Sequence, residues 1–336
     1  MVGWAEVEIE HDSLDRVLME LYEALLKSPD RNRGTRGDTV ELLGVAIRLR
    51  KPRARLSRSE DRGHPFSALG ELLWYLAGRD DLEFIQEYIP QYKKEADDGI
   101  LHGAYGPRLM GTKNSINQLQ NVTDLLRDRP GSRRAVVQLF DAKDLTENYR
   151  EIPCTTTLQF HLRNGVLHLT ASMRSNDAYW GLPHDVFCFT MLQEMMARRL
   201  GATLGEYYHY AGSMHVYDDH VEGVRRYVDE GYQQTVEMPA MPDGDPFDHV
   251  EALLDAEAKI RRGEELQAVD VFEQPYWADI VRLLQVFWAS GQPEKLDALK
   301  AEFSSATYRE YLEGRRTKRK RSFLDMITGR NADVAE

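Results

Sequence analysis

Residues 155–175 read TTTLQFHLRNGVLHLTASMRS, and this stretch decides the class of fold. It holds two runs rich in β-branched and apolar residues, TTTLQFHLRN and VLHLTASMRS, with the turn signal RNG between them. Short runs of this composition, bounded by turn residues, are typical of β-strands. The stretch therefore predicts two consecutive strands joined by a short turn.

Helices and further strands are predicted on both sides of this pair, because apolar residues recur at either helical or strand spacing. The predicted helices cover residues 12–28, 65–78, 114–128 and 185–201, and the further strands cover residues 39–50, 133–140 and 203–220. These helices and strands do not alternate strictly. We therefore predict an α+β fold rather than a doubly wound parallel sheet.

The composition changes after about residue 233. A proline- and aspartate-containing stretch, EMPAMPDGDPFDHV, is followed by charged helical patterns, and no strand pattern occurs after it. We predict two parts, a catalytic domain at residues 1–232 and a helical C-terminal extension at residues 233–336.

Composition and charge limit the classes of function. The chain has 336 residues, a formal net charge of −12 and two cysteines, so we expect neither broad capture of nucleic acid nor a disulfide framework. The N-terminal MVGWAEVEIEHD does not resemble a signal peptide, and no apolar run approaches the roughly 18 residues that span a membrane. We therefore expect a cytoplasmic protein without a membrane partner.

Arginines nevertheless recur where predicted elements begin or end. Guanidinium groups match phosphate oxygens two at a time, and a neighbouring hydroxyl adds a further donor. Any one pair of arginines is more often solvated at the surface than bound to a ligand. The repetition of such pairs in an acidic chain nevertheless favours a small anionic ligand. The residues concerned are Arg33 and Arg36 in a glycine loop, Arg133 and Arg134 in GSRRAVV, and Arg174 with Ser175 in MRSND.

Several other polar residues are candidates for chemistry. Glu71 stands in the apolar segment SALGELLWYLAG, where it either reaches the wet edge of the helix or is buried with a raised pKa. His215 and Tyr217 would share one face of a strand, and Tyr105 stands between glycines in GAYGP. Cys154 precedes the first quoted strand, where free cysteine is more often core than nucleophile.

Taken together and in this order, GELLWYLAG, GSRRAVV, PCTTTLQF, RSND, GLPHDVF and GSMHVYDDH resemble the thymidylate synthase and deoxycytidylate hydroxymethylase family. The resemblance covers roughly residues 12–232. It implies a large twisted mixed sheet flanked by helices, a homodimer, a pyrimidine nucleoside monophosphate as substrate, and 5,10-methylenetetrahydrofolate as cosubstrate. No metal is expected.

The resemblance also assigns roles to single residues. Cys154 would be the nucleophile that adds to C6 of the pyrimidine, and nearby arginines would favour its thiolate. Glu71 would order water, and Tyr105 would lie near the C5 proton. The remaining expected contacts are phosphate to Arg174 and Ser175, phosphate to Arg133 and Arg134 of the other subunit, phosphate to Arg33 or Arg36, sugar to His215 and Tyr217, and the folate pterin to Asp177.

Asp185 stands in GLPHDVF, where thymidylate synthases carry asparagine. An amide satisfies the O4 acceptor and N3 donor of uracil, whereas a carboxyl can accept from the N4 amine of cytosine and share a proton with N3. Thr155 follows the cysteine where synthases usually have histidine, and the segment EYIPQYKKEADDG lacks the tryptophans that shield the one-carbon intermediate from water. These departures point to the hydroxymethylase branch.

We therefore expect a dCMP 5-hydroxymethyltransferase that adds water after one-carbon transfer. The sequence leaves three alternatives open: a hydroxymethylase acting on CMP, a thymidylate synthase methylating dUMP, and a non-catalytic relative that binds nucleotide or RNA. Retention of Cys154 and Glu71 together argues against the last.

Overall fold

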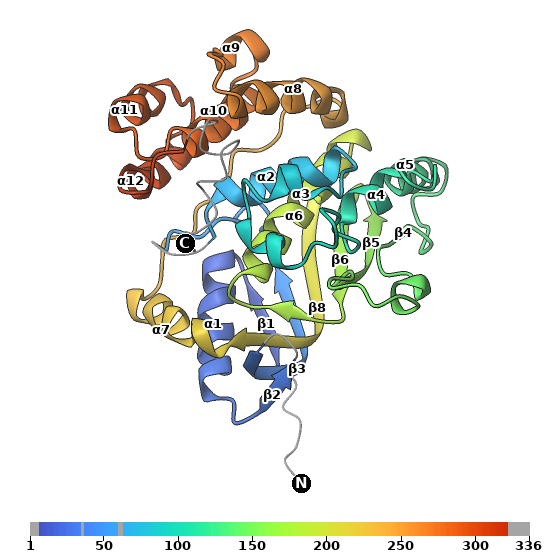
Figure 1. Ribbon diagram of the computed structural model, residues 1–336. Helices are drawn as coiled ribbons and strands as arrows, with labels where there is room; N and C mark the ends of the chain where they lie inside the picture. Colours follow the sequence, from blue (N-terminus) through green and yellow to red (C-terminus); the bar gives the residue numbers. More distant parts are fainter. Residues whose placement is uncertain (1–6, 35–36, 60–62, 322–336) are drawn as a thin grey trace.

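The computed structural model describes residues 7–34, 37–59 and 63–321. Its strands form one eight-stranded mixed sheet in which the order is β1-β3-β8-β6-β5-β4, with β2 beside β3 and β7 beside β8 (Figure 1). The strands are β1 Glu8–His11, β2 Arg31–Gly34, β3 Gly37–Leu49, β4 Val136–Gln138, β5 Thr155–Arg163, β6 Val166–Met173, β7 Asn176–Asp177 and β8 Thr203–Tyr217. The α+β class predicted from sequence is confirmed.

Residues 155–175 form the antiparallel pair β5 and β6, which pairs from Thr155 opposite Met173 to Arg163 opposite Val166, with a register shift between Thr155 and Thr157. The turn between them has φ of 50° at Asn164 and 76° at Gly165. Positive φ at both central residues is what a type I′ hairpin turn requires, and Asn-Gly is its preferred sequence. The hairpin brings the residues before β5 close to those after β6.

Helices surround the sheet. They are α1 Leu14–Lys27, α2 Pro65–Leu76, α3 Leu82–Ile85, α4 Tyr105–Met110, α5 Gln118–Asp128, α6 Gly181–Arg199, α7 Val221–Glu230, α8 Val250–Arg261, α9 Ala268–Val271, α10 Pro275–Trp288, α11 Pro293–Glu302 and α12 Glu313–Arg316. Short 3₁₀ segments are Pro90–Lys94, Ala142–Leu145, Asp218–His220, Pro246–His249 and Ala306–Leu312. Helix α6 is buried along most of its length and packs against both α2 and the sheet.

Several predicted boundaries differ in the structure, and two of the differences concern the site described below. Residues 31–34, expected within a loop, form strand β2 and pair antiparallel with residues 37–40 of β3. Helix α6 begins at Gly181 rather than at Asp185, because Asp177 accepts hydrogen bonds from the backbone N–H groups of Tyr179 and Trp180 and turns the chain just ahead of the helix. Asp185 consequently lies inside the helix.

The helices after residue 249 gather at one end of the molecule beside α2 (Figure 1). Tyr88 links them to the rest: its ring stacks on Phe287 of α10 at 4.7 Å between centroids, and its hydroxyl donates to Glu257 of α8 at 2.8 Å. Gly70 of α2 makes room for this ring, since a Cβ there would lie 2.1 Å from Tyr88. No strand follows β8 in the described part of the chain. The division at residue 232 stays a prediction.

No helix within the described ranges combines the length and apolar composition needed to cross a membrane.

Candidate active site

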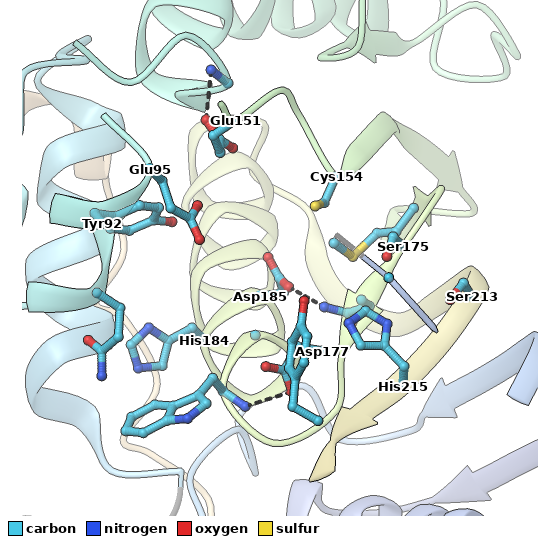
Figure 2. Close-up of a pocket in the computed structure, with 18 of the residues that line it drawn as sticks. Tyr92, Glu95, Glu151, Cys154, Ser175, Asp177, His184, Asp185, Ser213 and His215 are labelled. Carbon is cyan, nitrogen blue, oxygen red and sulfur yellow. Dashed lines mark hydrogen bonds between the residues drawn. The ribbon is translucent and has the colours of Figure 1, made fainter. Parts of the chain in front are cut away.

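A cavity of about 760 Å³ opens between the β2–β3 hairpin, helix α2, the segment after it, the start of β5 and helix α6. Figure 2 shows the labelled side chains around it, with Asp185 on α6 between Tyr92 on one side and Cys154 and His215 on the other. The predicted site residues that line this cavity are Glu71, Tyr105, Cys154, Arg174, Ser175, Asp177, Asp185, His215 and Tyr217. Segments far apart in sequence thus meet at one place.

Three predicted phosphate ligands lie elsewhere in this subunit. Arg33 is exposed on β2, although its neighbours Asn32 and Gly34 line the cavity. Arg133 and Arg134 are exposed just before β4, at the edge of the sheet opposite β1, and they are not among the lining residues. Their predicted contacts with a partner subunit's phosphate stay a prediction. Arg36 lies outside the described residues.

Cys154 is half-buried at the cavity wall, immediately before β5. Arg174, which follows β6, donates from Nε to the Pro153 carbonyl at 2.9 Å and from Nη2 to the Ile152 carbonyl at 3.1 Å. The same Nη2 lies 3.7 Å from Cys154 Sγ. A guanidinium in contact with sulfur stabilises the thiolate, which is the nucleophilic form of cysteine. The hairpin thus places a cation beside the thiol.

Tyr105 begins helix α4, and its hydroxyl oxygen accepts hydrogen bonds from both the N–H and the Oγ1 of Thr155, at 3.0 and 2.9 Å. Because both of these contacts are donated to the oxygen, the phenol proton remains available to donate into the cavity. Burial raises the pKa of Tyr105 well above its usual value, so that proton is retained. Thr155, singled out from the sequence as a departure, therefore orients this phenol.

Glu71 is buried on α2 and receives three donors. Tyr75 and Tyr92 donate from their hydroxyls to Oε1, each at 2.9 Å, and His184 Nδ1 lies 2.8 Å from Oε2. Burial alone raises the pKa of Glu71, but the contact with His184 and the two phenols outweighs it, and the pKa ends below the usual value. The raised pKa considered from sequence is wrong for this reason. Glu71 is a buried, charged carboxylate.

Asp185 faces the same cavity but behaves in the opposite way. Among the described residues, Asn176 donates to it, from Nδ2 to Oδ2 at 2.8 Å. Burial, together with the nearby charge of Glu71, raises the pKa of Asp185 well above its usual value. A shift in this direction favours the neutral acid, which has one donor and one acceptor oxygen.

The far wall of the cavity is formed by β8 and the short strand β7. His215 and Tyr217 share a face of β8, with their rings perpendicular and 5.3 Å apart. Asp177 pairs with His215 across the two strands and caps the approach to α6 through its Oδ1. Ser213 donates to Glu41 of β3 at 2.5 Å, which ties the neighbouring strand to this wall.

Several cavity residues were not assigned from the sequence. Tyr75 stands four residues after Glu71 on α2, a spacing that places both on one helix face and could have indicated the contact. His184 directly precedes Asp185, but its contact with Glu71 depends on how α6 packs against α2. Tyr92 reaches Glu71 from a 3₁₀ segment, and no local pattern indicates that.

Among the residues that the structure describes, no group of three or more His, Cys, Asp or Glu side chains is arranged to hold a metal ion.

Fold and cavity together define an α+β protein with a half-buried thiol beside an arginine and two buried carboxyls. Comparison with known proteins identifies its family: the thymidylate synthase family model matches residues 19–251. That is more than half of the chain, and the chain therefore belongs to the thymidylate synthase family. The resemblance stated from sequence is confirmed.

Similar proteins carry two kinds of name. A deoxyuridylate hydroxymethyltransferase of Bacillus phage SP01 is 30% identical over 252 residues, which cover 70% of this chain and 65% of that protein. A thymidylate synthase of Symbiobacterium thermophilum is 33% identical over 174 residues, which cover 47% of this chain and 61% of that protein. A thymidylate synthase of Corynebacterium aurimucosum is 29% identical over 215 residues, which cover 61% of this chain and 80% of that protein. The chain matches less than two thirds of the length of the first two relatives.

Proposed function

We propose that this protein transfers the one-carbon unit of 5,10-methylenetetrahydrofolate to C5 of dCMP and adds water, giving 5-hydroxymethyl-dCMP and tetrahydrofolate. The observation that carries the proposal is Asp185, a buried acid with a raised pKa that lines the cavity of a thymidylate synthase family member. Membership in that family supports the coarser part, one-carbon transfer to a pyrimidine nucleotide.

Cys154 acts as the nucleophile. Its sulfur adds to C6 of the pyrimidine, which makes C5 nucleophilic toward the one-carbon unit. Arg174, 3.7 Å from the sulfur, supports the thiolate, while Ser175 beside it lines the cavity and is available for the nucleotide phosphate. Tyr105 presents a protonated phenol to the same space and is placed to hydrogen-bond a water that takes up the C5 proton.

Water addition, rather than reduction to a methyl group, is assigned to Glu71. A charged carboxylate can accept a proton from water as the water attacks the exocyclic methylene. The segment between α2 and Tyr105 contains no tryptophan, and Tyr92 from this segment contacts Glu71 instead. The name of the phage SP01 relative, a hydroxymethyltransferase, also favours this outcome.

Asp185 supports cytosine as the base. As a neutral acid it can accept from the N4 amine and donate to N3, so that both polar atoms of that edge are paired. Leaving one such contact mismatched in a buried site costs about 1–3 kcal/mol. His215 and Tyr217 are assigned to the sugar and Asp177 to the folate pterin, and all three line the cavity.

The proposal includes a homodimer in which Arg133 and Arg134 reach the phosphate of the partner's site. Their exposure at the sheet edge, away from the cavity of their own subunit, supports this role. Arg33 or Arg36 would complete the phosphate site from the β2–β3 hairpin.

A second candidate is hydroxymethylation of dUMP, which the name of the phage SP01 relative favours. Incubation of the full chain with methylenetetrahydrofolate and each of dCMP, CMP and dUMP, followed by mass spectrometry of the products, tests the proposal. We expect hydroxymethyl-dCMP as the main product. Hydroxymethyl-dUMP would support the second candidate, hydroxymethyl-CMP would move the choice to the ribonucleotide, and methylated dUMP would overturn hydroxymethyl transfer.

The nucleophile is tested with a pair of cysteine variants. Cys154→Ser should abolish turnover while dCMP binding stays measurable by calorimetry. Cys188→Ala is the matched control, because Cys188 is fully buried on α6 and does not line the cavity. Turnover retained in Cys154→Ser would refute the assignment.

A further inference from the structure

A row of buried polar side chains runs from Asp185 into the protein interior, beginning at Asn176, which lines the cavity. Asn176 Oδ1 lies 2.9 Å from His209 Nε2, and His209 Nδ1 lies 2.8 Å from the hydroxyl of Tyr207. Asn176 is 3% exposed, His209 1% and Tyr207 not at all. Neither His209 nor Tyr207 lines the cavity, and the proposed chemistry uses neither.

The chemistry of the three groups determines which group donates and which accepts in each hydrogen bond of this row. Burial lowers the pKa of His209 to about 3, so the imidazole is neutral and has one donor and one acceptor nitrogen. Asn176 Oδ1 can only accept, so the proton of the ring lies on Nε2, and Nδ1 accepts from the Tyr207 hydroxyl, which burial keeps protonated. His209 then donates from Nε2 to Asn176 Oδ1. Asn176 in turn has its amide nitrogen toward Asp185 Oδ2.

This direction fixes the two oxygens of Asp185. Oδ2 receives an N–H and serves as the acceptor, so the proton of the neutral acid resides on Oδ1. Gly181 leaves room for the arrangement, because a Cβ there would lie 3.0 Å from Asn176 Nδ2 and 3.6 Å from Asp185 Oδ2.

A fixed proton matters because the two candidate bases present their polar groups in opposite order. Cytosine presents a donor at N4 and an acceptor at N3, whereas uracil presents an acceptor at O4 and a donor at N3. A carboxyl whose proton can move between its oxygens pairs with either base. One whose proton is fixed pairs fully with only one of them.

We propose that Tyr207, His209 and Asn176 form a positioning relay that fixes the proton of Asp185 on Oδ1 and thereby sets the choice between cytosine and uracil nucleotides. The relay rests on the proposed function for Asp185 as the residue that reads the base. His209 and Tyr207 lie outside the cavity lining, and the relay acts on the base through Asp185.

The test measures binding of dCMP and dUMP by calorimetry to the full chain without folate, so that turnover is not required. Wild-type protein should separate the two nucleotides by about tenfold or more, the size expected for one mismatched buried contact. His209→Phe should reduce this ratio to about threefold or less, and Tyr207→Phe, which only frees the tautomer of His209, should give an intermediate ratio. Thr190→Val, a buried α6 variant outside the cavity, is the control and should keep the wild-type ratio.

A second readout does not depend on binding. Long-range ¹H–¹⁵N spectra of the histidine side chains, with His209 assigned by its loss in His209→Phe, should show the neutral Nε2–H tautomer from about pH 5 to pH 9. An Nδ1–H tautomer would reverse the row and overturn the relay, as would an unchanged ratio in a folded His209→Phe variant. A wild-type preference for dUMP that His209→Phe abolishes would overturn the cytosine assignment and support the relay.

Discussion

Glu71 and Asp185 are two carboxyls buried in one cavity, 4% and 9% exposed, and their pKa values shift in opposite directions. The difference comes from their partners and not from their burial. Glu71 on α2 accepts from two phenols and an imidazole, whereas Asp185 on α6 accepts from the Asn176 amide and lies near the charge of Glu71. Carboxyls whose pKa values are driven apart are suited to different tasks. The part of the cavity lining around Glu71 (the α2 wall) is thus suited to moving protons, and the part around Asp185 (the α6 wall) is suited to reading a neutral base.

Removing the charge from the α2 wall should have the largest effect. Glu71→Gln should lower kcat for hydroxymethyl transfer by roughly 10²–10³-fold, because water activation loses its general base. The Kd for dCMP should change by less than about threefold, because recognition belongs to the other wall. Product analysis of reactions quenched at timed intervals gives kcat, and calorimetry gives the Kd for dCMP.

Glu87→Gln is the matched control, since Glu87 is a half-buried carboxyl on the segment after α2 that does not line the cavity. A Glu71→Gln variant that loses dCMP affinity but keeps kcat would reverse the assignment of the two walls.

A substitution in the α6 wall should have the opposite effect and change nucleotide preference more than kcat. Asp185→Asn should shift the ratio of kcat/KM for dCMP to that for dUMP by roughly 10- to 100-fold toward dUMP, because an amide pairs with the uracil edge. The kcat on the preferred nucleotide should fall much less than in Glu71→Gln. Competition between the two nucleotides in one reaction measures the ratio directly. An unchanged ratio would remove the main argument for cytosine.

The opposite pKa shifts also predict a pH dependence that only one wall carries. Because the pKa of Asp185 is raised, the neutral acid exists below that pKa and the ionised form above it. Binding of dCMP should therefore be strongest at lower pH and weaken as pH rises through the Asp185 pKa, by up to about tenfold per pH unit. The charged groups that act on Asp185 are Glu71 and Asp177, and both raise its pKa.

Calorimetry between about pH 7 and pH 9.5 tests this, since the phosphate of the nucleotide is already doubly ionised there. Asp185→Asn is the reference and should bind dCMP weakly with a flat profile. Affinity of the wild type that increases with pH, relative to this reference, would show that the ionised carboxylate binds the base.

The two walls differ in how far sequence could predict them. The hairpin of β5 and β6 followed from Asn164 and Gly165 and from the strand patterns around them, because local turn chemistry determines it. The position of Asp185 followed from a motif. Its neutral state did not, because Asn176 is nine residues away and the next partner, His209, is a further 33. Such contacts are formed only when β7, β8 and α6 pack together.

Glu71 illustrates the same limit more strongly. Its burial could be read from the apolar residues around it, and burial alone raises the pKa of a carboxyl. The sign of the shift is reversed by Tyr92 and His184, which are 21 and 113 residues away in sequence. Local patterns predict which residues are buried, but only the tertiary structure determines the partners that fix their charge.

A substitution in the C-terminal helices should have the smallest effect on catalysis, and that effect should act only through the α2 wall. Phe287 of α10 stacks on Tyr88, and Tyr88 lies in the segment that brings Tyr92 to Glu71. Phe287→Ala should lower kcat about threefold by loosening Tyr92, leave the dCMP to dUMP ratio unchanged, and cost about 3 kcal/mol of stability. Phe303→Ala, which removes a ring buried among the C-terminal helices against Tyr308, should cost similar stability without changing kcat. Equal kcat values in the two variants would show that the extension stabilises the fold but does not support the α2 wall.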